Sequence, residues 1–471
     1  MKNLSRLGFV FFICIVVPLL SMAQSVQTNT FIQGVVNFDD QYEAVLNFPE
    51  SKAEDNNMIV PISKSGNFAF KFPLQKWSFV KLTIIPKARN QQLALNFPLY
   101  LQPGSKTSMQ LNYNDTSYLT LKANNLSGSN KALVLYSNYR YQKMKYWYMY
   151  PPKTDEVKTA MMQYFDQVKK LDAKYKIGST AVRNYLQAWA MNDYIDNLTS
   201  QSARNKEMKL DQLVFDIPLS PAVVYNKPQA LMLSETFRCL DEYVRVMNTS
   251  NIEEINPAKK TASKMNFVKK QFTNEAIKNL FYERELAEYI RKFRITDKTN
   301  FEADQNTFNK LADFISSTEK KNELINQFSN LQYTLAGASL PPIHLKDRNG
   351  NEVALSNFKG KNIYIDLWAS WCIPCIQEIP NLHQLEEEYK DKNIVFLSIS
   401  IDEDKTAWQN KMKELKLEGH QLETGASGFE KMMNVQGIPH FILYDSDGKL
   451  LHYKAPRPGT QEIRNIFNSL K

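Results

Sequence analysis

The chain has 471 residues, of which 43% are hydrophobic and 12% aromatic, so it is too long for a single core and too apolar for a disordered protein. Its formal net charge is +9, but most of the surplus lies between about residues 126 and 335, where the basic residues are mixed with acidic ones. This distribution indicates a solvated helical surface, so no nucleic acid is expected among the partners.

The first 23 residues have the features of a secretory signal peptide. Lys2 and Arg6 precede the apolar run GFVFFICIVVPLL, which is too short for a stable membrane span, and small residues follow up to Ala23. Cleavage is expected before Gln24, and the mature protein is expected to be exported. The mature chain keeps three cysteines, too few for a fold that depends on disulfides.

Residues 24–125 are expected to form a β-rich domain. Several runs are β-branched or aromatic, some alternate with polar residues, and turn-forming residues separate them. These runs are FIQGVVNF, YEAVLNF, NFAFKFPL, FVKLTIIP and SMQLNY. The pattern predicts a small antiparallel sandwich or barrel, and it contains no catalytic constellation.

Residues 126–335 are expected to form an α-helical domain. Apolar residues recur at steps of three and four in DEVKTAMMQYFDQVKKLDAKY, AVRNYLQAWAMNDYIDNL, LSETFRCLDEYVRVM and NEAIKNLFYERELAEYIRKF. The run YSNYRYQKMKYWYMYPP could stack on nucleic-acid bases, but packing of a helix core explains it better in an exported protein. Cys239 is expected to be a buried apolar residue, and a regulatory thiol is the less favoured alternative.

Residues 336–471 alternate strand and helix patterns. A hairpin over Asn349 and Gly350 precedes the buried strand NIYIDLW, a helix over 373–389, the buried strand IVFLSISI and the helix KTAWQNKMKEL. HFILYD and KLLHYK then form a hairpin, and TQEIRNIFNSL is a final helix. This order is typical of a thioredoxin-type α/β domain. We therefore expect a multidomain chain with a β sandwich-like, an α-helical and a thioredoxin-fold part.

Two cysteines of the last region, Cys372 and Cys375, lie close together in WASWCIPC. A zinc site would need two more ligands nearby, but there is no second CxxC, and His383 lies on the same predicted helix. A structural crosslink over so short a loop gains little stability. Redox chemistry explains the position, because the pair follows a buried strand and begins a helix, where N–H groups and the helix dipole stabilise a thiolate.

Each cysteine then has a separate expected role. Cys372, at the helix N-terminus, is the expected nucleophile and should be exposed enough to attack the disulfide of a partner. Cys375, one turn into the helix, would resolve the mixed disulfide. Pro374 suits the first helical turn, because its missing N–H has no partner there.

The segment IDLWASWCIPCIQEIP resembles the active site of the TlpA/ResA-type thioredoxin-like proteins, which are exported thiol–disulfide oxidoreductases. The resemblance covers about residues 336–471. Upstream, PLYLQPGSKTSMQLNY and the helical region after it resemble accessory domains of larger bacterial members. The resemblance implies a periplasmic enzyme that reduces disulfides of substrate proteins and is reduced again by a membrane electron donor. It implies neither a metal nor another cofactor, and it assigns no oligomeric state.

Two acidic residues match the family pattern. Asp366, six residues before Cys372, matches a buried acid that assists proton transfer at Cys375; a carboxyl beneath the pair should have a raised pKa. An ordinary strand-end aspartate is the alternative. Glu378 matches an active-site glutamate that tunes the cysteines, and an exposed helix glutamate is the alternative. Many relatives lack the first acid, so the division of labour between the two stays open.

Three apolar positions complete the expected site. Pro439, in GIPHF, matches the cis-proline that faces the cysteine pair and presents backbone to the substrate, and Ile438 would border the substrate groove. Trp371 is expected to frame the site. Trp368 would do the same or belong to the core.

Two further functional hypotheses remain open. An oxidase or isomerase would use the same cysteines in the opposite direction, and the stability of the reduced state discriminates the two. Alternatively, the chain is a binding or assembly protein with an auxiliary redox domain, because about two thirds of the mature chain lies outside that domain.

Overall fold

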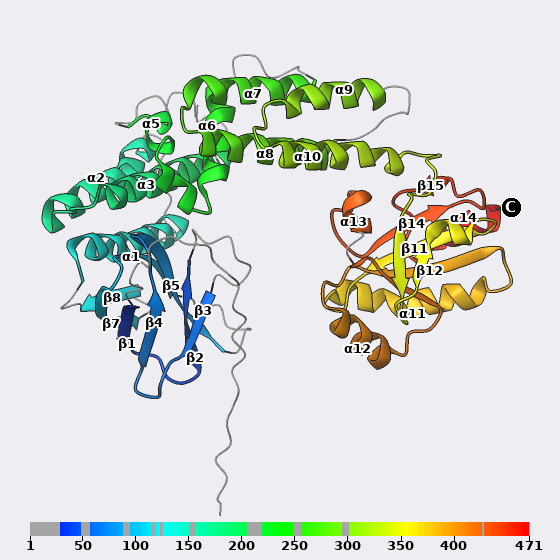
Figure 1. Ribbon diagram of the computed structural model, residues 1–471, viewed down its shortest axis with the longest axis horizontal. Helices are drawn as coiled ribbons and strands as arrows, with labels where there is room; N and C mark the ends of the chain where they lie inside the picture. Colours follow the sequence, from blue (N-terminus) through cyan, green and yellow to red (C-terminus); the bar gives the residue numbers. More distant parts are fainter. Residues whose placement is uncertain are drawn as a thin grey trace, which may run out of the picture. The chain divides into compact units, whose positions relative to one another are not determined.

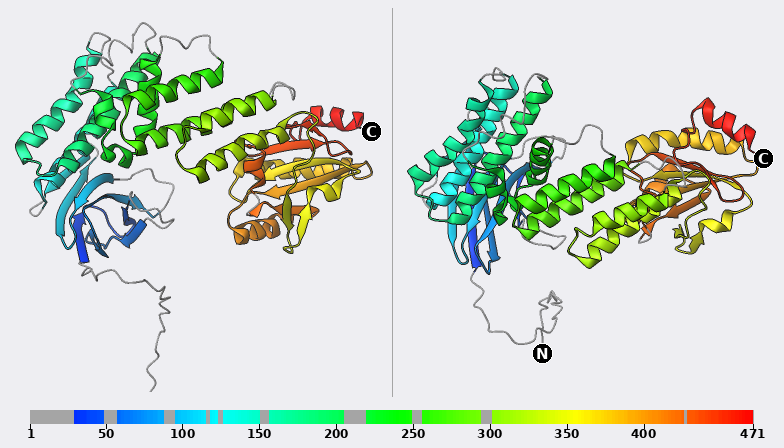
Figure 2. Two further views of the ribbon diagram at one scale, coloured as in Figure 1. Left: turned by 45° about the horizontal axis from the view of Figure 1, so that its top comes forward. Right: turned by 90° about the horizontal axis from the view of Figure 1, so that it is seen from above.

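The computed structural model describes residues 29–48, 57–87, 95–114, 118–122, 126–149, 156–204, 219–248, 256–293, 301–425 and 428–470. The chain divides into two compact units, Met1–Ala190 and Met191–Lys471, and each is described by itself (Figures 1 and 2). The expected signal peptide lies outside the described residues, and the expected domain boundaries stay predictions. Among the helices of the described residues, none is both long enough and apolar enough to cross a membrane.

The first unit contains two four-stranded β-sheets. One sheet has the order β4-β1-β7-β8, and the other has the order β3-β2-β5-β6. The strands are β1 (Asn29–Val36), β2 (Tyr42–Asn47), β3 (Asn57–Pro61), β4 (Asn67–Pro73), β5 (Ser78–Pro86), β6 (Leu95–Leu101), β7 (Lys106–Asn114) and β8 (Tyr118–Lys122). Ile32 and Phe70 of one sheet share a core with Leu46 and Leu82 of the other. The described strands therefore form a sandwich.

The expectation of a wholly antiparallel sandwich is wrong at one pair, because β1 and β7 run parallel. After β1 the chain visits both sheets, and it returns to the first sheet in the direction of β1. Strands β3, β6 and β8 were not predicted, and in β6 Pro98 interrupts the apolar pattern. Pro98 is tolerated because β6 is an edge strand, where a missing N–H leaves no gap in the sheet.

Helices α1 (Gly128–Met149), α2 (Val157–Tyr175) and the start of α3 (Thr180–Arg204) complete the first unit. The Asn130 amide ties α1 to β6, because it accepts a hydrogen bond from the Tyr100 N–H at 2.7 Å and donates one to the Tyr100 carbonyl at 3.1 Å. The Tyr136 ring lies 5.3 Å from that of Trp189. Packing of a helix core thus explains the described part of the aromatic and basic run.

The second unit begins with a group of helices. Two of them, α6 and α8, were predicted from the sequence. The Asn274 side chain caps α8 by accepting hydrogen bonds from the N–H groups of Ala276 and Ile277. Three others, α7, α9 and α10, were not predicted one by one, because their apolar residues are few. The helices are α5 (Pro221–Tyr225), η1 (Pro228–Met232), α6 (Thr236–Met247), α7 (Pro257–Gln271), α8 (Glu275–Lys292), α9 (Phe301–Ala312), α10 (Thr318–Asn330) and η3 (Leu331–Thr334).

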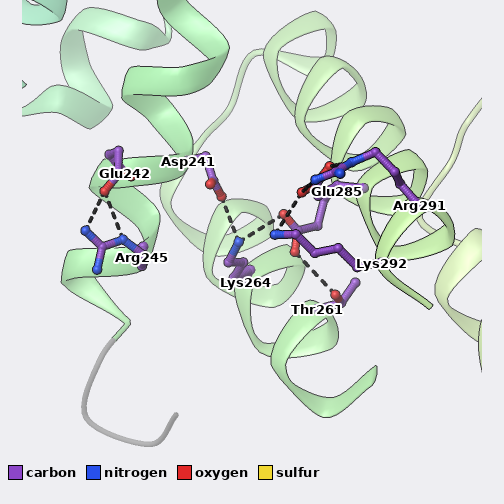
Figure 3. A network of polar contacts seen from close by, with 9 residues as sticks. Asp241, Glu242, Arg245, Thr261, Lys264, Glu285, Arg291 and Lys292 are labelled. Carbon is purple, nitrogen blue, oxygen red and sulfur yellow. Dashed lines mark hydrogen bonds and ion pairs between the residues drawn. The ribbon is translucent and has the colours of Figure 1, made fainter. Parts of the chain in front are cut away.

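A buried ion-pair cluster joins α6, α7 and α8 (Figure 3). The Lys264 ammonium lies 2.8 Å from a carboxylate oxygen of Asp241 and 3.1 Å from one of Glu285. The Thr261 hydroxyl donates a hydrogen bond to the other Glu285 oxygen. Both Lys264 and Glu285 are buried. A buried charge is tolerated only when it is paired, so these contacts hold the three helices in register.

The rest of the second unit is a seven-stranded sheet with the order β10-β9-β13-β12-β11-β14-β15 (Figure 1). Strands β11, β12 and β13 are parallel neighbours, and the other pairs are antiparallel. The elements are β9 (His344–Asp347), β10 (Glu352–Ala354), η4 (Leu355–Phe358), β11 (Asn362–Trp368), α11 (Ile373–Glu388), β12 (Ile394–Ser400), α12 (Lys405–Leu415), β13 (His420–Glu423), α13 (Phe429–Met432), β14 (His440–Tyr444), β15 (Leu450–His452) and α14 (Gln461–Ser469).

Local sequence explains most of this domain. Gly350, with φ of 88°, makes the turn between β9 and β10, and the Asp347 side chain accepts hydrogen bonds from the N–H groups of Asn349 and Asn351. Leu385 of α11 and Phe467 of α14 pack in one core with Tyr364 of β11. The domain has a thioredoxin fold, as predicted. In the chain, strand β11 is followed by helix α11.

Candidate functional site

The two cysteines lie where strand β11 gives way to helix α11. All seven residues of β11 are buried, so the end of this strand is held firmly in the core. Cys372 is the N-cap residue of α11, and its sulfur accepts a hydrogen bond from the Cys375 N–H at 3.2 Å. The two sulfurs form a disulfide of 2.06 Å. The structure therefore brings the predicted pair together at the helix N-terminus, where a thiolate of Cys372 would be stabilised.

The expected exposure of Cys372 is wrong for the disulfide form. Cys372 is only 4% exposed, because it packs in one cluster with Trp368, Trp408 and Met412. The residues beside it are open instead. Trp371 is 65% exposed and Ile373 is 68% exposed. Trp371 and Ile373 thus form an exposed apolar rim beside the cysteine.

The second predicted edge of the site comes from the loop before β14. The peptide bond between Ile438 and Pro439 is cis, as the resemblance implies. Ile438 is half-buried and packs against the cluster that holds the two cysteines. The next residue, His440, is buried, and burial lowers its pKa to about 4. His440 is therefore neutral near pH 7 and adds no charge beside the proline.

Asp366 lies within β11, an interior strand of the sheet. Its pairing partners are Ser398 of β12 and Phe441 of β14, and its side chain is 7% exposed. Burial, together with the nearby carboxylates of Glu386 and Glu378, raises the pKa of Asp366 to about 7. An ordinary strand-end aspartate would remain charged at neutral pH. Asp366 is instead poised to gain or lose a proton there.

Glu378 is neither exposed nor alone. Its side chain is 16% exposed and accepts hydrogen bonds from the Arg457 guanidinium at 2.8 Å and from the Asn381 amide at 3.2 Å. Arg457 lies 79 residues further along the chain, so no local signal in the sequence could have identified it. The ion pair holds the glutamate carboxylate one turn beyond Cys375.

Sequence reasoning missed the residue that anchors the loop before Cys372. The buried Asp402 carboxylate accepts hydrogen bonds from the N–H of Ser370 at 2.9 Å and from its hydroxyl at 2.6 Å. The Ser400 hydroxyl donates to the same carboxylate at 2.8 Å. An acid directly after a buried strand was the available signal. These bonds fix the backbone two residues before Cys372.

The third cysteine lies away from this site. Cys239 is fully buried in α6, and its sulfur donates a hydrogen bond to the Asn192 carbonyl at 3.4 Å. Burial raises the pKa of this thiol to about 12, so it is protonated and unreactive near neutral pH. The expectation of a buried structural cysteine is confirmed. The described residues contain no group of three or more His, Cys, Asp or Glu side chains that could hold a metal ion.

Known proteins resemble this domain. A model of the Redoxin family matches residues 335–470. The thiol–disulfide oxidoreductase ResA of Bacillus cereus is 29% identical over 124 residues, which cover 26% of this chain and 72% of ResA. The crystal structure of the thioredoxin domain of a thiol–disulfide oxidoreductase from Bacteroides vulgatus is 29% identical, with coverage of 28% of this chain and 95% of that one, and a TM-score of 0.26.

A second crystal structure from Bacteroides vulgatus, of a protein assigned as a thiol–disulfide oxidoreductase, is 37% identical and is covered over 99% of its length, with a TM-score of 0.28. It covers 30% of this chain. The family match and the ResA relatives agree with the dithiol geometry of the site. Residues 335–470 therefore form a Redoxin domain, and the protein is a thioredoxin-like thiol–disulfide oxidoreductase that resembles ResA.

Proposed function

We propose that this protein is an exported oxidoreductase that reduces disulfides of substrate proteins in the periplasm. The observation that carries the proposal is the Cys372–Cys375 disulfide at the N-terminus of α11, beside a cis-proline and an exposed apolar rim. The exposed apolar side chains beside the disulfide suit partner proteins with exposed hydrophobic segments. The expected signal peptide is the support for export, and a membrane electron donor would restore the dithiol.

The reaction exchanges one disulfide for another. The Cys372 thiolate attacks a substrate sulfur, so that a mixed disulfide forms and the first substrate thiolate leaves and takes up a proton. The Cys375 thiol then loses its proton, and its thiolate attacks the Cys372 sulfur. That step releases the second substrate thiolate and forms the Cys372–Cys375 disulfide. Two electrons pass from the enzyme to the substrate, and the substrate leaves as two thiols.

Substrate binding and proton handling are assigned to separate groups. Trp371, Ile438 and Pro439 would contact the substrate chain around the sulfur under attack. Asp366 would accept the proton of the Cys375 thiol, because its pKa of about 7 lets it act as a base at neutral pH. Glu378, held by Arg457, would tune the charge next to Cys375.

Replacing Asp366 with Asn should remove an inflection near pH 7 from the rate of disulfide reduction. In the wild type the rate falls as pH drops through about 7, because a protonated Asp366 cannot accept the Cys375 proton. The D366N variant should lack this inflection and be at least about tenfold slower above it. Stopped-flow measurement of the rate against pH tests this, and an unchanged inflection in D366N would assign it to another group.

The same substitution changes the pH dependence of stability. The folded-state pKa of Asp366 lies above its unfolded value, so the folded state binds more protons over the window from about pH 4 to 7. Stability contributed by this group is therefore present below pH 4 and is lost as pH rises through 7. Urea unfolding of D366N should show a weaker loss of stability over that window than the wild type does.

The direction of the reaction is tested by two assays in parallel. The reduced protein should reduce a disulfide-containing model substrate such as insulin faster than the oxidised protein oxidises a dithiol peptide. The opposite order would favour the alternative of a disulfide oxidase or isomerase. The assembly-protein alternative predicts that a strain with Cys372→Ser and Cys375→Ser behaves as wild type while a deletion strain does not.

A further inference from the structure

A small polar cavity lies between β11 and α11. It leaves about 10 Å³ for the centre of a water molecule, which is about the size at which a cavity admits one water. Its wall consists of residues from the strands β11, β12 and β13, from α11 and from the loop after α12. The polar or titratable ones are Asp366, His383, Glu386, Ser398 and Gln421. Trp368 and Ile379 belong to the wall as well, and they pack in the cluster with the two cysteines.

Most polar side chains of this cavity carry hydrogen-bond acceptors, but the Nε1–H of Trp368, which also lines it, is a buried donor without a partner among the described residues. Asp366 and Glu386 contribute carboxyl groups from opposite walls, and no Lys or Arg lines the cavity. Gln421 uses its amide N–H₂ on the Glu418 carbonyl, and its buried Oε1 has no partner among the described residues. Two carboxylates and an amide oxygen cannot satisfy one another without protons, and the Trp368 N–H and the Ser398 hydroxyl offer fewer donors than these groups have acceptor oxygens. The cavity therefore favours a proton shared between its two carboxyl groups.

The titratable groups of the cavity differ in their exposure to solvent. Asp366 is buried, Glu386 is half-buried, and His383 is exposed to solvent. His383 and Glu386 lie three residues apart on α11, so their side chains are neighbours on one face of the helix. Asp366, Glu386 and His383 thus line one cavity and range from buried to exposed.

We propose that Glu386 is the positioning residue through which Asp366 exchanges its proton with solvent. The inference rests on the proposed function, in which Asp366 takes the proton of the Cys375 thiol. That proton passes from the Asp366 carboxyl to the Glu386 carboxylate, and Glu386 then loses it to solvent beside His383. No electron moves, and each turnover leaves both carboxyl groups in their starting state.

The electrostatic surroundings agree with such a transfer. On the side of Asp366 that faces α11, the charged or titratable groups are Glu378, His383 and Glu386, and Tyr364 is its neighbour on β11. Its partner on β14 is the apolar Phe441 and its partner on β12 is Ser398. Burial also raises the pKa of Glu386. The pKa values of both carboxyl groups are therefore shifted upward, so either group can hold the proton.

The test follows the resolution step in the whole chain. Reduced protein is mixed with oxidised glutathione at low buffer concentration, and the decay of the mixed disulfide is measured by acid quench and mass spectrometry. Glu386→Gln should slow this decay about tenfold and should move the inflection that belongs to Asp366 to lower pH, because one carboxylate neighbour is lost. Added acetate should restore part of the rate, because a small acid can replace the missing proton carrier.

A matched control stands next to Glu386. Glu387→Gln makes the same change of charge on an exposed residue outside the cavity, and its rate and inflection should equal those of the wild type. If Glu386→Gln behaves like Glu387→Gln while Asp366→Asn is slow, the relay through Glu386 is overturned and the proposed function stands. If Asp366→Asn itself decays at the wild-type rate, the proposed role of Asp366 fails.

Discussion

Replacing Cys372 with Ser should abolish the reduction of insulin disulfides by dithiothreitol, with a fall of at least about 100-fold toward the uncatalysed rate. The hydroxyl of serine does not ionise near neutral pH, so the helix N-terminus has no thiolate to stabilise. The Cys375→Ser variant should fail differently. Its Cys372 still attacks, but nothing resolves the product, so the mixed disulfide should accumulate and be visible by mass spectrometry.

The remaining cysteine provides the matched control for this prediction. Cys239→Ser removes a thiol that is buried in α6 and protonated near neutral pH, and the serine hydroxyl can keep the bond to the Asn192 carbonyl. Its turnover should equal that of the wild type. If Cys372→Ser accumulated the mixed disulfide and Cys375→Ser captured no substrate, the roles of nucleophile and resolving residue would have to be exchanged.

Replacing Lys264 with Met should cost about 3–5 kcal/mol of folding free energy at neutral pH. The substitution leaves the buried Glu285 carboxylate without its cation, and Asp241 loses the same partner (Figure 3). Methionine fills the volume, so the loss comes from the unpaired charge rather than from a cavity. Urea unfolding of the whole chain, followed by its helical circular dichroism signal, measures the change.

An exposed pair gives the comparison for this effect. Lys320→Met in α10 removes the partner of Glu323, and both side chains are in contact with water, so the change should stay below about 1 kcal/mol. The double variant with Lys264→Met and Glu285→Leu should recover most of the lost stability, because no buried charge remains. A Lys264→Met variant as stable as Lys320→Met would show that the cluster does not hold the three helices.

Strong local patterns made the C-terminal domain predictable from the sequence. The uninterrupted apolar run of β11 and the turn at Gly350 specify their structures locally. Strand β13, with the sequence HQLE, was missed, because it is short and half polar and owes its conformation to pairing with β12 and β9. In the same way, the parallel pairing of β1 and β7 depends on where the chain returns after the second sheet.

The site was predictable only where its chemistry is local. Cys372 and Cys375 stand together in the chain, so their pairing followed from spacing and from the strand before them. The ion pair between Glu378 and Arg457 joins distant segments, and no periodicity reports it. The burial of Cys372 was mispredicted, because packing against α12 determines it rather than its own neighbours in the chain.

The reduction potential of the Cys372–Cys375 pair is the most direct test of the central claim. It is obtained by equilibrating the protein in dithiothreitol or glutathione buffers and counting free thiols at each ratio. The proposed reductant predicts a potential near that of thioredoxin, about −270 mV, which requires a dedicated electron supply. A potential near about −120 mV would mark a disulfide donor and would contradict the proposed direction.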